Sequence, residues 1–180
     1  MKRLWLAIII TVFTGAVIWQ PSEETQAVEV KQKPEIGFAA PHFTLTGLDQ
    51  QTYQVAGKRE KPLVLNFWAS WCGPCKMEAP DLRKLHEKYG QQIDFFGVNV
   101  TKNDSPEGAQ AFVKQYELAF PIPMDITGEV ANRYWIQAFP TTYLVDRQGI
   151  IRKKIIGMVD GATLETELKQ LLEEKTGPLR

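Results

Sequence analysis

The sequence predicts an α/β protein with a mixed central sheet that is flanked by helices. Two largely apolar runs, Leu63–Trp68 and Ile93–Val100, are typical of buried strands, and the first has the character of a strand that is covered on both faces. The stretch 76–89 between them has helical periodicity, so the two strands should be parallel and joined by a right-handed crossover. Later in the chain, Thr141–Val145 and Ile150–Ile156 flank a turn, which predicts an antiparallel hairpin in the same sheet.

A β-hairpin is predicted ahead of the first buried strand. Ala40–Leu45 and Thr52–Val55 both alternate apolar and polar residues, and the turn-like segment Gly47–Gln50 separates them. The helix that follows the first buried strand should present residues 79, 82, 85 and 89 on one apolar face. Pro80 should kink this helix, and Gly90 should end it.

Three helices are expected in the second half of the chain. Asp104 is a candidate N-cap with a proline two residues later, so a helix should begin there and run to about Tyr116. An extended segment, Phe120–Asp125, and a brief helix, Val130–Trp135, should follow. Asp160 should cap the last helix, whose apolar face carries Leu164, Leu168, Leu171 and Leu172.

Composition excludes several classes of function. Twenty-one basic side chains balance twenty-one acidic ones in 180 residues, so no bulk charge favours a nucleic-acid partner. The chain has two histidines, His42 and His86, and neither stands at a ligand spacing from its two cysteines. A zinc site needs about four ligands, so we expect neither a metal ion nor another cofactor.

The N-terminal region is predicted to be a membrane anchor. Leu4–Gln20 contains no charged residue and would span about 26 Å as a helix, close to the ~30 Å hydrocarbon core of a bilayer. Lys2 and Arg3 favour a cytoplasmic N-terminus and a single pass through the cell membrane. We therefore expect a signal-anchor helix at 1–20, a polar tether at 21–35 and one extracytoplasmic domain at 36–176.

Two other interpretations of the N-terminal region stay open. The apolar run could belong to a cleaved signal peptide, for which residues 25–27 (Thr-Gln-Ala) offer a mediocre cleavage site. It could also be a buried helix of a soluble protein.

The two cysteines form a dithiol motif, Trp71-Cys72-Gly73-Pro74-Cys75, between a buried strand and a helix. This position favours the thiolate of Cys72, because helix N-termini stabilise negative charge. Cys72 should be the nucleophile, exposed beside Trp71 and Pro74, and Cys75 should be the resolving thiol. An inert structural disulfide is the alternative, although so short a ring removes little entropy from the unfolded chain.

Phe139-Pro140 precedes a buried strand whose start should lie next to the dithiol. A cis bond at Pro140 would bring the backbone of Phe139 against Cys72 and offer strand-like pairing to a substrate, whereas a trans turn proline is the plain alternative. Glu78, one helical turn after Cys75, is the nearest acid in sequence. It could support the thiols or simply face solvent.

Several motifs together resemble thioredoxin and, more closely, the TlpA/ResA-like extracytoplasmic thiol-disulfide oxidoreductases. The likeness covers roughly residues 36–174 and implies a thioredoxin-like fold, an inserted segment between Val100 and Pro140, and a cis Pro140. The motifs that carry it are Gly37–Leu45, Leu65–Cys72, the Cys-Gly-Pro-Cys dithiol, Pro80 and Pro140-Thr141.

The chain departs from these families at two places. Asn66 stands where thioredoxin has a buried aspartate, so a base for Cys75 is missing or is a water. The cytochrome-maturation members carry one glutamate between their cysteines and another after the second strand. This chain has Gly73-Pro74 and Thr101–Asp104 at those places, which puts a specific role in haem-protein maturation in doubt.

The sequence therefore predicts a membrane-anchored thiol-disulfide oxidoreductase that exchanges disulfides with extracytoplasmic proteins, apocytochrome c among the candidates. The resemblance implies an upstream electron donor in the membrane, such as a CcdA/DsbD-like protein. One alternative is a peroxiredoxin-like thiol peroxidase, but such chemistry needs a hydroxyl residue and a proline where Ala69 and Leu65 stand. The other is a binding module with an inert disulfide.

Overall fold

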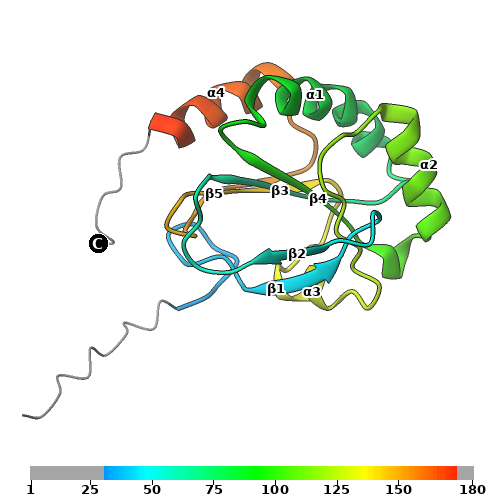
Figure 1. The fold of residues 1–180 in the computed structure, drawn as a ribbon, viewed down its shortest axis with the longest axis horizontal. Coiled ribbons are helices and arrows are strands. Elements are labelled where there is room, and N and C mark those ends of the chain that lie inside the picture. Colours follow the sequence, from blue (N-terminus) through cyan, green and yellow to red (C-terminus); the bar gives the residue numbers. More distant parts are fainter. Residues whose placement is uncertain (1–30, 174–180) are drawn as a thin grey trace, which may run out of the picture.

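The computed structural model describes residues 31–173, which form two layers of elements around one sheet. Helices α1 (Gly73–Tyr89), α2 (Pro106–Tyr116) and α4 (Gly161–Glu173) cover one face (Figure 1). The hairpin of β1 (Phe43–Thr46) and β2 (Thr52–Val55) lies on the other face with the short helix α3 (Glu129–Arg133). Each layer contributes one cluster of buried apolar side chains. The predicted mixed α/β architecture is confirmed.

The sheet has the strand order β4-β3-β5-β6. The central strand β3 (Leu63–Trp68) pairs in parallel with β4 (Asp94–Asn99) and antiparallel with β5 (Thr141–Val145). β6 (Ile151–Ile156) is the antiparallel partner of β5, as predicted. In this register Thr141 stands opposite Phe67, so the residues just before β5 lie beside the turn that leads from β3 to the dithiol.

The start of α1 differs from the prediction. The helix begins at Gly73 rather than at residue 76, because the Cys72 sulfur accepts a hydrogen bond from the Cys75 N–H and caps it. Pro80 lies inside this helix, and Gly90 ends it as expected.

The N-cap of α2 was predicted wrongly. Ser105 accepts a hydrogen bond from the Gly108 N–H, whereas Asp104 turns away from the helix and bonds elsewhere. A 3-10 turn, η1 (Thr101–Asn103), fills the link between β4 and α2. Farther along the chain, α3 (Glu129–Arg133) is shorter than expected, while Asp160 caps α4 as predicted.

The extended segment 120–125 links the sheet to the hairpin. Met124 makes a parallel bridge to Asn99 at the end of β4, and Pro123 makes an antiparallel bridge to Gly47 after β1. The otherwise open edge of β4 is therefore covered, which protects its backbone groups from pairing with another chain.

Contacts with the domain begin slightly before the predicted boundary at residue 36. Gln32 bridges to Ala39, and its side chain accepts a hydrogen bond from the His42 N–H. The predicted anchor at 4–20 and most of the predicted tether lie outside the described residues. Among residues 31–173, the helices are all too short or too polar to cross a membrane.

Candidate active site

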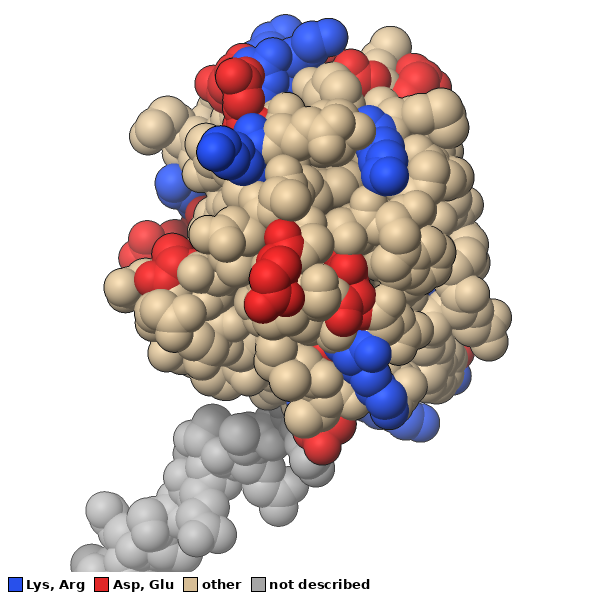
Figure 2. Space-filling model, turned by 90° about the vertical axis from the view of Figure 1, so that its right-hand side faces the viewer, with Lys and Arg blue, Asp and Glu red and all other residues tan. Residues whose placement is uncertain are grey.

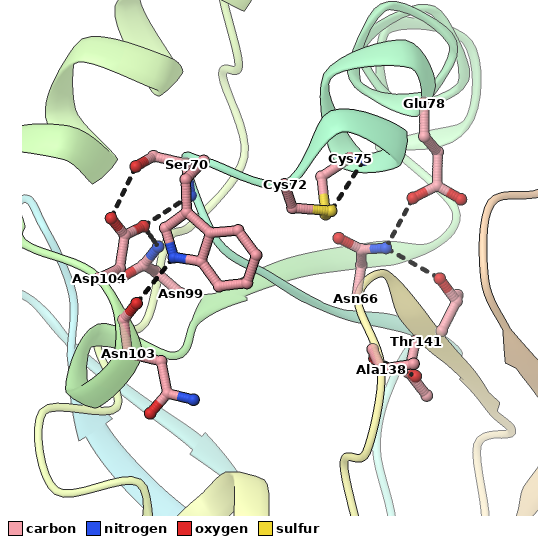
Figure 3. The surroundings of a disulfide bond; sticks show 12 residues. Asn66, Ser70, Cys72, Cys75, Glu78, Asn99, Asn103, Asp104, Ala138 and Thr141 are labelled. Carbon is pink, nitrogen blue, oxygen red and sulfur yellow. Dashed lines mark hydrogen bonds between the residues drawn. A yellow bond between two sulfur atoms is a disulfide. The ribbon is translucent and has the colours of Figure 1, made fainter.

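The two cysteines are joined in a disulfide at the junction of β3 and α1 (Figure 3). The Cys72 carbonyl accepts a hydrogen bond from the Lys76 N–H, and its sulfur accepts one from the Cys75 N–H at 3.1 Å. The Cys72 sulfur thus lies where the free N–H groups of a helix N-terminus favour a thiolate. The expectation that Cys72 is exposed was wrong, since both cysteines are 3% exposed in this oxidised form.

A groove of about 350 Å³ runs past the disulfide. One wall is the dithiol loop, and the other is the stretch Ile136–Phe139 before β5. None of its lining residues is charged; they are Trp71, Cys72, Gly73, Pro74, Asn103, Ile136, Gln137, Ala138 and Phe139. Trp71 is 59% exposed, and its ring meets that of Phe139 edge to face at 5.9 Å.

The Phe139–Pro140 peptide bond is cis, as the resemblance implied. Phe139 lines the groove opposite the dithiol loop. Within residues 31–173 neither the N–H nor the C=O of Phe139 has a hydrogen-bond partner. These two groups can therefore pair with an extended chain that enters the groove.

Glu78 is buried, which rules out the alternative that its carboxylate simply faces solvent. Its side chain turns from α1 towards β3 and accepts a hydrogen bond from Asn66 Nδ2 at 3.0 Å (Figure 3). The same amide nitrogen donates to Thr142 Oγ1 at 2.9 Å, and the Val159 N–H donates to Glu78 Oε1 at 3.3 Å. Burial raises the pKa of Glu78 from 4.5 to about 7, although the hydrogen bonds from the Val159 N–H and Asn66 lower it in part.

Asn66 and Cys75 border the same small cavity of about 10 Å³. Because Asn66 holds the Glu78 carboxyl group, this acid belongs to the buried side of the dithiol. A carboxyl group with a pKa of about 7 can both accept and release a proton near neutral pH.

A second polar cluster lies on the opposite side of the disulfide, and sequence reasoning missed it (Figure 3). Asp104 accepts hydrogen bonds from the N–H and the Oγ–H of Ser70 and from Asn99 Nδ2. The Asn103 carbonyl accepts a hydrogen bond from Trp71 Nε1 at 2.7 Å. The sequence around Asp104 resembles a helix start, so Asp104 was predicted to be an N-cap and not a partner of Ser70. Ser70 is 34 positions away, and no local pattern connects the two residues.

Charge is dispersed over the surface that Figure 2 shows. Seen from the side of α2, the face is largely uncharged, with basic and acidic side chains in small mixed groups. No field of one sign therefore surrounds this side of the molecule. Across the described residues, no three His, Cys, Asp or Glu side chains gather closely enough to hold a metal ion.

Comparison with known proteins places this geometry in a family. The model of the AhpC/TSA family matches residues 36–154, which include the hairpin, the dithiol and nearly all of the sheet. The chain belongs to the AhpC/TSA family.

Individual relatives indicate the type of activity more closely. The thiol-disulfide oxidoreductase ResA of Bacillus cereus (strain ATCC 10987 / NRS 248) is 33% identical, with 94% of this chain and 96% of that protein aligned. The thioredoxin-like protein YneN of Bacillus subtilis (strain 168) is 32% identical, over 93% and 98% of the two chains. The crystal structure of StoA from Bacillus subtilis superimposes with a TM-score of 0.62 at 27% identity, covering 70% of this chain and 95% of that one.

These relatives and the dithiol geometry agree on the chemistry. This AhpC/TSA-family chain has a thioredoxin-like fold and is a thiol-disulfide oxidoreductase. The predicted resemblance to ResA-like oxidoreductases is confirmed.

Proposed function

We propose that this protein is a membrane-anchored oxidoreductase that exchanges disulfides with extracytoplasmic proteins through Cys72 and Cys75. One observation carries the proposal. The Cys72 sulfur lies at the N-terminus of α1 beside a groove whose opposite wall presents the unpaired backbone groups of Phe139. The helix N-terminus stabilises the Cys72 thiolate. The free N–H and C=O groups of Phe139 can hydrogen-bond to the backbone of the partner chain and hold it in register.

In the reducing direction, the Cys72 thiolate attacks one sulfur of a substrate disulfide. A mixed disulfide forms, and the other substrate sulfur leaves as a thiolate. Cys75 then attacks the Cys72 sulfur, which closes the internal disulfide and releases the second substrate thiolate. The substrate gains two electrons and the dithiol loses two.

We assign Glu78 as the proton acceptor for Cys75 in the second step. Glu78 is 2% exposed, and its carboxyl group is held by Asn66, which borders the same small cavity as Cys75. Because its pKa is about 7, it can take the thiol proton as Cys75 becomes a nucleophile. Glu78 thereby replaces the aspartate that thioredoxin carries at the position of Asn66.

The surroundings of the groove favour an uncharged, extended segment of the partner protein. Met77 follows Cys75 by two residues and is 61% exposed. Ile156 and Met158 flank Gly157, whose N–H bonds the carbonyl of Pro140, and both are about half exposed or more. Methionine side chains adapt their shape to different apolar partners, so Met77 and Met158 would suit substrates of varied sequence.

The cellular location rests on the N-terminal sequence. The uncharged run at 4–20 and the basic residues Lys2 and Arg3 support a single-pass anchor with the catalytic domain outside the cytoplasm. Such a domain would draw electrons from a CcdA/DsbD-like membrane protein. Envelope proteins, including apocytochrome c, would be its substrates.

Peroxide reduction receives no support from the site. The positions that should hold a hydroxyl residue and a proline in a peroxiredoxin-like site hold Ala69 and Leu65, and both are fully buried. No hydroxyl group stands three residues before Cys72 to bind a peroxide.

Two cysteine variants test the proposal. Cys72→Ser should abolish insulin reduction, because the attacking sulfur is lost. Cys75→Ser should accumulate mixed disulfides through Cys72 in cell envelopes, and the captured proteins can be identified after non-reducing electrophoresis. The double variant is the control for non-specific capture. Unchanged insulin reduction by Cys72→Ser, or captured partners that are all cytoplasmic, would contradict the proposal.

A further inference from the structure

Asp104 makes a hydrogen-bond arrangement that the exchange steps above do not use. Its Oδ2 atom accepts from the Ser70 N–H at 2.6 Å and from Asn99 Nδ2 at 2.8 Å, while Oδ1 accepts from Ser70 Oγ at 2.6 Å. Three donors thus converge on one half-buried carboxylate. Hydrogen bonds of this kind to an ionised group are short and strong.

Further hydrogen bonds connect the Asp104 carboxylate to the end of β4. Asn99, at the end of β4, is fully buried, and its Oδ1 atom accepts a hydrogen bond from Thr101 Oγ1 at 2.9 Å. The Asp104 N–H donates to the Thr101 carbonyl at 3.0 Å. The carboxylate is therefore fixed to the sheet, and Ser70 is held to it.

The same turn orients the residue next to the nucleophile. Trp71 Nε1 donates to the carbonyl of Asn103, the neighbour of Asp104. The Trp71 ring then meets Phe139 across the groove. Asp104 and Asn103 together hold two consecutive residues, Ser70 and Trp71, immediately before Cys72.

The helix α2 leaves room for this arrangement at one position. A Cβ atom on Gly108 would come within 2.7 Å of Ser70 Oγ and 3.0 Å of Asp104 Oδ1. These contacts are too close for a side chain. Glycine at 108 thus lets α2 start directly against the carboxylate.

We infer that Asp104 is a positioning residue for protein substrates: through Ser70 and Asn103 it holds Trp71 as one wall of the groove. It touches neither substrate nor sulfur. A side-chain amide could not replace it, because asparagine offers one acceptor oxygen to three donors. This inference rests on the proposed binding of partner proteins in the groove.

If Asp104 has this role, its loss should affect the reduction rates of protein disulfides and of small disulfides differently. A protein disulfide must fit between Trp71 and Phe139, so its rate depends on where the indole stands. A small neutral disulfide such as 2-hydroxyethyl disulfide needs only the Cys72 sulfur. Loss of the Asp104 contacts should therefore slow the first reaction far more than the second.

The test compares Asp104→Asn and Ser70→Ala with wild type in the full-length protein in detergent. Each reduced protein is assayed with insulin and with 2-hydroxyethyl disulfide. Both variants should slow insulin reduction by roughly ten-fold or more and change the small-disulfide rate by less than about two-fold. The position of Trp71 matters only for a substrate that must fit into the groove, and small displacements of a positioning group can cost a large factor in rate. Ser70→Ala keeps the carboxylate and removes one donor, which provides a milder change if Asp104→Asn folds poorly.

Ser105→Ala is the matched control. It removes the N-cap of α2, one residue from Asp104, and leaves the contacts to Ser70 in place. It should cost stability and keep the wild-type ratio of the two rates.

A structural readout separates this inference from the proposed function. Hydrogen exchange of the Trp71 indole N–H, followed by NMR, should be at least about ten-fold faster in both variants, because its bond to Asn103 opens more often. Unchanged indole exchange, or an unchanged ratio of rates in both variants, overturns the inference. Failure of the wild-type protein to reduce insulin would instead overturn the proposed function, and indole exchange would still decide the role of Asp104.

Discussion

Glu78 Oε2 accepts a hydrogen bond from Asn66 Nδ2 at 3.0 Å on the buried side of the Cys72–Cys75 disulfide. The contact joins α1 to the central strand β3, and Thr142 on β5 shares the same amide nitrogen. An acid from the helix thus contacts Asn66, the strand residue that stands at the position of the thioredoxin aspartate. Proton transfer from the resolving cysteine and part of the pH dependence of stability should both depend on this one carboxyl group.

The stability of the oxidised protein should fall as the pH rises from about 5 to about 8. The folded protein binds the Glu78 proton more tightly than the unfolded chain does, because burial raises the pKa of this group from 4.5 to about 7. The contribution, on the order of 3 kcal/mol, is complete below the unfolded pKa and is lost as the pH rises through the folded one. Urea unfolding at several pH values measures it.

Glu78→Gln should flatten this pH dependence, since an amide does not titrate. Glu87→Gln, on the exposed side of the same helix, is the control and should leave the slope unchanged. A wild-type curve that is as flat as that of Glu78→Gln would refute the role of Glu78 in stability.

Glu78→Gln should also slow the resolution of mixed disulfides. Without a proton acceptor Cys75 stays a thiol, so the second exchange step should be about 100-fold slower near neutral pH. Rapid quenching with a small alkylating agent would show the mixed disulfide of Cys72 accumulating. Attack by Cys72 itself should keep its wild-type rate. Equal resolution rates in the two proteins would mean that another group takes the proton.

Trp71→Ala and Phe139→Ala should weaken the binding of protein substrates. Each removes one of the two rings that face each other across the groove at 5.9 Å. KM for insulin should rise by about ten-fold, since a buried aromatic contact contributes on the order of 1 kcal/mol or more. Trp135→Ala removes an exposed ring that does not line the groove and serves as the control. A comparable rise in that variant would indicate a non-specific effect.

Gly97→Ala should destabilise the fold by about 1–3 kcal/mol through overpacking. A Cβ atom there would come within 2.8 Å of the Phe120 ring and 3.2 Å of Trp68 Nε1, both in the core above β4. Gly73→Ala is the control, because a Cβ atom at the start of α1 meets nothing within 4 Å. Thermal unfolding of the two variants should therefore differ clearly. Similar midpoints would show that the core around β4 adjusts more easily than its packing suggests.

Local patterns predicted the elements well where sequence neighbours settle the structure. The strand β5 and the cap of α4 by Asp160 follow the prediction, since alternation and capping act over a few residues. Asp104 was assigned to the wrong role for the same reason. Its sequence context satisfies the rules for an N-cap, but Ser105 satisfies them too, and the choice between them depends on Ser70 in another segment.

The sequence alone determined the chemistry and the architecture. Two cysteines three positions apart, after a buried strand and before an amphipathic helix, specify a redox dithiol at a helix N-terminus, because covalent spacing and periodicity are local. Only the tertiary structure decided that Glu78 is buried against Asn66, that Cys72 is covered in the oxidised state, and that Asp104 holds Ser70. Burial and hydrogen bonding between segments depend on how the helices pack on the sheet, and no local pattern encodes that packing.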